Sequence, residues 1–264
     1  MRRLRAAWRV FQVVLLIVAM AMDFVLRPVS CAQEGAAKMH RYCRRMVRAL
    51  GVEWSVEGRL PEHGAVVSNH LSYLDILLYS SIRPFVMVAK AEVRGWPGIG
   101  WLTRQAGTVY VVRSGGPATY PAVNQAMAEA YRSGLPVLFF PEGTTTDGSE
   151  VLPFRRGLFH SVLNEGVALQ ISALRYSCED PGVSIADDVC WWGDALLAPH
   201  LWRLACADGV RATVRFGDAV EEREDRFVLS QTARQQIAKM YAELSAVAVG
   251  VPSRAHETEL IEAL

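Results

Sequence analysis

From residue 51 onward, short runs of apolar and β-branched residues alternate with longer helix-like runs. A helix between two successive strands is the crossover that parallel pairing needs. The alternation therefore predicts an α/β fold with a parallel or mixed sheet. We expect strands at residues 52–56, 65–68, 85–89, 108–112, 137–140, 168–174 and 211–216, and helices at 72–80, 97–105, 120–133, 157–165, 194–205 and 230–246.

The size of the chain limits it to one large core. It has 264 residues, of which 51% are hydrophobic and 21% charged, which is too few for two large domains. The five cysteines are an odd number and have no metal-ligand spacing, as expected for reduced cytosolic thiols. The net charge of +1 does not indicate a nucleic-acid binder. We therefore predict no metal site and no nucleic-acid partner.

An apolar run at residues 10–22 allows three interpretations. As a helix it covers only about 20 Å of a hydrocarbon core that is about 30 Å thick. A cleaved signal peptide has a loose cleavage-site match at residues 30–32, but charged residues and a proline interrupt the approach to it. A full span would bury Arg9 and Asp23. A helix that dips into one leaflet, followed by a basic amphipathic helix at 36–50, buries neither charge and is the interpretation we favour.

Charge is unevenly distributed along the chain. The first 50 residues hold ten basic and two acidic side chains, so the remainder is acidic. A basic N-terminal section favours attraction to anionic headgroups of the cytoplasmic leaflet. We expect three parts: membrane-associated helices at 1–50, a globular domain at 51–249 and a peripheral tail at 250–264.

Two short motifs follow apolar runs, where strands should end. His70 and Asp75 lie where the run at 65–67 meets the expected helix at 72–80. Such a junction can turn both side chains toward one cleft, with His70 as a general base and Asp75 fixing its tautomer. By itself the spacing also fits a turn histidine and an ordinary first-turn helix acid. The sequence Phe-Pro-Glu-Gly-Thr at 140–144 follows another apolar run, and ligands of open α/β sheets gather at the carboxyl ends of strands.

The order of these motifs resembles a known family. Asn-His-x-Ser-x-x-Asp at 69–75, a strand that ends at Arg113, and Phe-Pro-Glu-Gly-Thr at 140–144 resemble the glycerolipid, or lysophospholipid, acyltransferases. The resemblance covers about residues 51–217. It implies a mostly parallel seven-stranded sheet flanked by helices, with an N-terminal membrane-binding helical pair. It also implies an enzyme without a cofactor at the cytoplasmic face of the membrane. That enzyme would acylate a lysolipid from acyl carrier protein or coenzyme A.

The resemblance also assigns roles to residues. His70 would take the proton of the lysolipid hydroxyl and return it to the leaving thiolate, while Asp75 orients the imidazole. Asn69 and Ser72 would line the site, although a turn and a helix cap explain them equally well, and Ser72 is well placed for a cap. Gly143 lets the backbone approach a ligand closely. The residues expected to bind the acceptor are Lys90, Arg113, Glu142, Gly143, Thr144 and Thr145.

Position 145 departs from the family pattern. Members that bind glycerophosphate commonly have arginine there, whereas this chain has Thr145. The Gly-Thr-Thr-x-Asp-Gly form resembles the bacterial lyso-ornithine-lipid acyltransferase branch, so we expect an acceptor other than lysophosphatidic acid. Phosphatidate formation is the alternative, because Arg113, Lys90 and Arg155 also supply positive charge.

Two other classes of protein compete with a transferase. A hydrolase would use His70 to activate water, but the common Gly-x-Ser-x-Gly esterase motif is missing from the sequence. A catalytically inactive lipid-binding protein would not need the intact set of His70, Asp75, Glu142 and Arg113. The sequence therefore favours the transferase over both.

Overall fold

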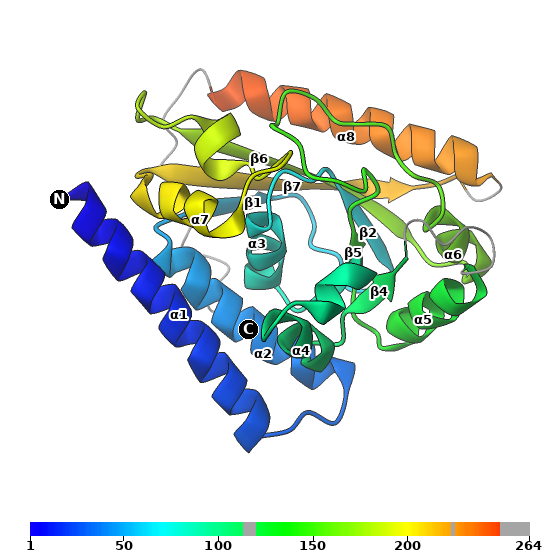
Figure 1. Ribbon diagram of the computed structural model, residues 1–264. Helices are drawn as coiled ribbons and strands as arrows, with labels where there is room; N and C mark the ends of the chain where they lie inside the picture. Colours follow the sequence, from blue (N-terminus) through cyan, green and yellow to red (C-terminus); the bar gives the residue numbers. More distant parts are fainter. Residues whose placement is uncertain (113–119, 223–224, 249–264) are drawn as a thin grey trace.

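The computed structural model describes residues 1–112, 120–222 and 225–248 (Figure 1). Its sheet has seven strands in the order β1-β7-β6-β2-β5-β3-β4. All neighbours pair in parallel except β6 and β7, which are antiparallel. This confirms the predicted, mostly parallel seven-stranded α/β sheet. The strands are β1 (Glu53–Glu57), β2 (Ala65–Ser68), β3 (Val86–Lys90), β4 (Val109–Val111), β5 (Val137–Phe139), β6 (Leu169–Cys178) and β7 (Val210–Val220).

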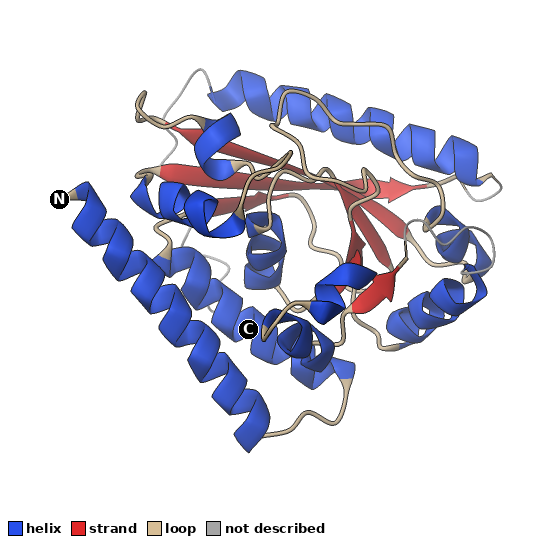
Figure 2. Ribbon diagram, in the orientation of Figure 1, coloured by secondary structure: helices blue, strands red, loops and turns tan. Residues whose placement is uncertain are grey.

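Helices cover both faces of the sheet (Figure 2). The long helix α8 lies along one face, whereas α3, α2 and α1 lie on the other, with α1 outermost (Figure 1). Two short helices, η1 (Ala91–Gly95) and η3 (Ile185–Val189), belong to connections between larger elements. The α-helices are α1 (Arg2–Leu26), α2 (Ala32–Ala49), α3 (Leu74–Ile82), α4 (Ile99–Gln105), α5 (Tyr120–Arg132), α6 (Phe159–Asn164), α7 (Leu197–Cys206) and α8 (Arg226–Ala248).

The middle of the sheet forms the core and positions the two motifs. Every residue of β2 and β5 is buried, as expected for parallel strands that are covered on both faces. The two strands are adjacent, and Val67 pairs with Phe139 at their carboxyl ends. The loops that follow these two strands therefore leave the sheet side by side. They carry His70 and Glu142, respectively.

The N-terminal helix α1 packs along the α/β body, on α2 and α7. Among the described residues it is the one helix that is long and apolar enough to cross a membrane. The two charges that a span would have buried are instead paired with other parts of the chain. Arg9 donates to the carbonyl oxygen of Ala207 over 2.6 Å and lies 3.1 Å from Asp208, and Asp23 lies 3.6 Å from the ammonium group of Lys38.

Candidate active site

His70 and Asp75 meet in the loop between β2 and α3. The Nδ1 atom of His70 lies 2.7 Å from Oδ2 of Asp75. An ionised carboxylate can only accept hydrogen bonds, so Nδ1 carries the hydrogen and Nε2 has a free lone pair. The His70 side chain is 12% exposed and that of Asp75 is fully buried. The predicted pair is therefore formed, and the imidazole is its accessible end.

The Asp75 carboxylate is held by three further hydrogen bonds. Its Oδ2 accepts from the backbone N–H groups of Leu71 and Ser72, over 2.7 and 3.0 Å. Its Oδ1 accepts from the Tyr176 hydroxyl on β6 over 2.7 Å. Burial, followed by the charge of Asp75, raises the pKa of Tyr176 well above its usual value, so the phenol keeps its proton and donates. Tyr176 could not be predicted as a partner of Asp75 from the sequence, because nothing in its local sequence marks this strand residue.

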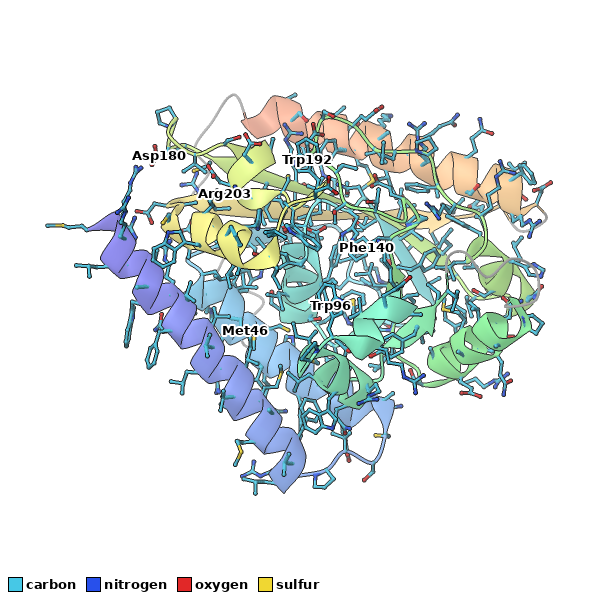
Figure 3. The ribbon with its side chains drawn as sticks, in the orientation of Figure 1. Met46, Trp96, Phe140, Asp180, Trp192 and Arg203 are labelled. Carbon is cyan, nitrogen blue, oxygen red and sulfur yellow. The ribbon has the colours of Figure 1, made fainter. Side chains whose placement is uncertain are left out.

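The loop after β5 fixes His70 from the other side. The His70 ring stacks on Phe140, with 4.0 Å between ring centroids and 9° between planes, and Phe140 lies near the centre of the molecule (Figure 3). The His70 backbone N–H donates to Oε1 of Glu142 over 2.9 Å. The His70 carbonyl accepts from the backbone N–H of Thr146 over 3.0 Å. Both main-chain groups of His70 are therefore bonded to the segment that follows β5, one to the motif and one to the residue two positions beyond it.

Glu142, predicted to bind the acceptor, points into the protein. Its side chain is buried, and its Oε2 accepts from the backbone N–H of Leu152 over 3.1 Å. Burial raises its pKa from 4.5 to about 7, although the hydrogen bonds from His70 and Leu152 oppose the shift. One carboxyl oxygen of Glu142 thus bonds to the His70 loop, and the other bonds to the chain that follows the Phe-Pro-Glu-Gly-Thr motif.

The other predicted acceptor residues lie around the same edge of the sheet. Gly143 has φ of 76°, a conformation that favours glycine, and the Arg155 side chain, with its Nε 2.6 Å from the position of a Cβ, would have to move for any other residue. Thr144 is exposed and Thr145 is half-buried. Lys90 is exposed at the end of β3. Arg113 lies outside the described residues.

Asn69 and Ser72, predicted to line the site, are both buried. The Asn69 side chain accepts from the backbone N–H of Leu174 over 2.8 Å and donates to its carbonyl over 2.9 Å, which fastens the end of β2 to β6. The helix cap considered for Ser72 does not form: α3 begins at Leu74 without a side-chain cap. The Ser72 hydroxyl has no hydrogen-bond partner within the described ranges.

A cavity of about 430 Å³ opens beside the motifs, at the carboxyl ends of β3, β4 and β5. Its walls include Phe140, on which His70 stacks, and Gly143. Apolar side chains from the three strands line much of it, and three arginines contribute the charged part of its lining. The candidate base is therefore linked, through Phe140, to a space with apolar and cationic walls.

Comparison with known proteins identifies the class. The acyltransferase family model matches residues 52–172. A lyso-ornithine lipid O-acyltransferase of Rhodobacter capsulatus is 40% identical over 60% of this chain and 58% of its own length. The lyso-ornithine lipid O-acyltransferase of Pseudomonas aeruginosa is 35% identical over 73% of this chain and 74% of its own. The 1-acyl-sn-glycerol-3-phosphate acyltransferase of Neisseria meningitidis is 33% identical over 78% and 81%.

The fold agrees with these relatives. The crystal structure of the 1-acyl-sn-glycerophosphate acyltransferase PlsC from Thermotoga maritima superposes with a TM-score of 0.64, covering 96% of this chain and all of that one at 17% identity. This chain belongs to the lysophospholipid acyltransferase family. It is an O-acyltransferase of the lysophospholipid and lysophosphatidic acid type, and its substrates are lipids.

Proposed function

We propose that this enzyme transfers an acyl chain from a thioester of acyl carrier protein or coenzyme A to the free hydroxyl of a lysolipid, with His70 as the general base. The observation that carries the proposal is the 2.7 Å contact between Nδ1 of His70 and Asp75. The contact leaves Nε2 without a hydrogen bond to the described residues, and Phe140, on which the His70 ring stacks, lines a cavity with partly apolar walls.

In the proposed reaction Nε2 of His70 takes the proton of the lysolipid hydroxyl while that oxygen attacks the thioester carbonyl. The tetrahedral intermediate then expels the thiolate, which takes the proton back from the imidazolium. One C–O bond forms and one C–S bond breaks. Asp75 stabilises the imidazolium and fixes the tautomer. The acceptor oxygen itself attacks, so the reaction needs no nucleophile from the enzyme.

A lysolipid of the lyso-ornithine type is our preferred acceptor. Thr145 supports it, because a hydroxyl cannot replace a charge-assisted bond from arginine to phosphate, and so do the two lyso-ornithine relatives. Acylation of lysophosphatidic acid is the second candidate. The Neisseria relative supports that candidate, since its alignment covers the larger share of both chains.

We place the enzyme on the cytoplasmic face of the membrane, held by the outer face of α1. Exposed apolar side chains follow that face at alternating intervals of four and three residues, so they form a single stripe. Six of the ten basic residues in the first 50 already pair with acidic side chains within the protein. Apolar contact should therefore dominate over charge. The stripe consists of Leu4, Trp8, Phe11, Leu15, Val18, Met22 and Val25.

An assay with a labelled acyl thioester tests the reaction. Full-length protein is incubated with the thioester alone and with lyso-ornithine lipid, lysophosphatidic acid or lysophosphatidylethanolamine. Label that moves into lipid only when a lysolipid is present supports the transferase. Release of free acid without an acceptor would indicate a hydrolase, and no turnover an inactive lipid-binding protein. His70→Ala should lower transfer about 10²- to 10⁴-fold, whereas His63→Ala, at an exposed position outside the site, should not.

A further inference from the structure

Three arginines line the cavity beside His70. Arg155 and Arg156 lie in the segment before α6, and Arg226 begins α8. All three are exposed. In the part of the chain that the structure describes, none of their guanidinium groups has an ion pair. Three cations at one opening repel one another unless an anion joins them.

Local contacts position two of these arginines. The backbone N–H of Arg155 donates to the Pro141 carbonyl over 2.8 Å, and its side chain fills the space that a Cβ at Gly143 would take. The guanidinium carbon of Arg156 lies 3.5 Å from the centroid of the Phe227 ring, a cation–π contact that orients it. The Phe-Pro-Glu-Gly-Thr motif and the start of α8 therefore each position one arginine.

The rest of the cavity lining suits a hydrocarbon chain. Val88 of β3, Val111 of β4 and Phe139 of β5 contribute to its walls, together with Leu158. The combination of exposed guanidinium groups and an apolar interior matches an amphipathic molecule with an anionic head and an acyl chain. Arginine binds both carboxylate and phosphate in a bidentate manner, so the site accepts either anion.

We propose that Arg155, Arg156 and Arg226 form the site for the anionic headgroup of the acceptor lysolipid. The inference rests on the proposed transferase function and gives its acceptor a binding site. The competing source of an anion is the phosphate of the acyl donor.

Kinetics of three variants distinguish the two sources. Arg155→Gln, Arg156→Gln and Arg226→Gln should each raise KM for the lysolipid, by about 10-fold or more if one charge-assisted contact is lost. The KM for the donor and kcat should stay within a few-fold. Arg155→Lys should recover part of the loss, because it keeps the charge without the planar fork. Lys239→Gln, an exposed charge on the same helix as Arg226, is the control and should change nothing.

Direct binding separates this inference from the transferase proposal. Full-length His70→Ala protein, whose turnover is expected to be about 10²- to 10⁴-fold slower, should bind lysolipid, and adding Arg226→Gln should weaken that binding about 10-fold. A rise in the donor KM instead, or unchanged constants in all three variants, would overturn the anion site even if transfer is confirmed. If the melting curve shows that Arg155→Gln disturbs folding, the Arg226→Gln variant provides the test of the anion site. No described side chain bonds to Arg226, so this substitution should leave the fold intact.

Discussion

The Asp75 carboxylate accepts four hydrogen bonds, and only one of them comes from the imidazole. Asparagine at this position keeps the shape and one acceptor oxygen but loses the negative charge. We therefore predict that Asp75→Asn folds and lowers kcat by about 10²- to 10⁴-fold, because the imidazolium loses its counter-charge and Nδ1 its fixed hydrogen. Thermal melting and steady-state kinetics of the purified protein provide the measurement.

Tyr176→Phe is the matched control for Asp75→Asn. It removes the 2.7 Å bond to Oδ1 of Asp75 and leaves the bond to His70 in place. A neutral hydrogen bond contributes about 0.5–1.5 kcal/mol, so kcat should fall by less than about 10-fold. If kcat fell equally in Asp75→Asn and Tyr176→Phe, Asp75 would act through packing and not through His70.

Glu142 makes stability depend on pH. Burial raises its pKa from 4.5 to about 7. Between these two values the folded protein holds a proton that the unfolded chain has lost, so this group lowers the free energy of unfolding as pH rises through the window. The loss amounts to about 3 kcal/mol at most, from about 1.4 kcal/mol for each pKa unit.

The Glu142→Gln variant lacks this titration. Urea unfolding of both proteins at pH 5, 6 and 8 should show that the wild type loses stability relative to the variant as pH rises. Glutamine also gives up one acceptor for the N–H groups of His70 and Leu152, which adds an offset that is the same at every pH. A difference between the two proteins that does not change with pH would contradict the raised pKa of Glu142.

The contact of His70 with Asp75 was predicted from their spacing together with the order of the motifs, because both residues lie in one short segment at the end of a strand. The orientation of Glu142 was not predictable in this way. Its bond to Leu152 depends on how the chain returns after the motif, and the sequence of 140–144 does not show that path. Asn69 likewise bonds to Leu174 on β6, a contact that depends on strand order.

At the scale of elements, the positions of long periodic runs were predicted well, whereas the residues at which strands end were predicted poorly. The expected strand at 65–68 coincides with β2, whereas β6 and β7 both run past their expected ends at 174 and 216. These two strands form the antiparallel pair, where partly or fully exposed residues interrupt the buried ones and dilute the apolar signal. The helix η3 was missed, because one turn leaves no periodicity to detect.

Helix α1 was expected only over its apolar run, yet it covers Arg2–Leu26. We predict that its exposed stripe binds the bilayer. Leu15→Glu and Val18→Glu should each weaken sedimentation with anionic liposomes, because each puts a charge where an apolar side chain would enter the interface. Removal of residues 1–35 should have a larger effect, but it also uncovers α7. The point variants are therefore the cleaner measurement.

Gln235→Glu is the control for the stripe, since it adds the same negative charge at an exposed position of α8. Its sedimentation should match that of the wild type. High salt should weaken binding only in part, because most basic side chains of the N-terminal section have internal partners. Undiminished sedimentation of both stripe variants would show that α1 does not face the lipid.

At the scale of the whole molecule, acceptor choice depends on elements that are distant in the sequence. The strand order places the ends of β5, β3 and β4 next to one another, and the segment before α6 and the start of α8 complete the cavity. The balance of charge around this opening decides which headgroup fits best. A phosphate monoester carries up to two negative charges, whereas the ornithine headgroup has one carboxylate and one amine. An added cation should therefore favour phosphate.

Thr145→Arg tests that balance directly. The half-buried Thr145 lies two residues along the chain from Gly143, which lines the cavity. We predict that Thr145→Arg raises the specificity constant for lysophosphatidic acid relative to lyso-ornithine lipid by about 10- to 150-fold, the value of one charge-assisted contact of about 1.5–3 kcal/mol. Ser149→Arg adds the same charge at an exposed residue further along the same segment and should shift the ranking much less. The comparison requires kcat/KM for both lysolipids in all three proteins.

If the wild type already prefers lysophosphatidic acid, or if Thr145→Arg leaves the ranking unchanged, residue 145 does not select the acceptor and phosphatidate formation becomes the better assignment.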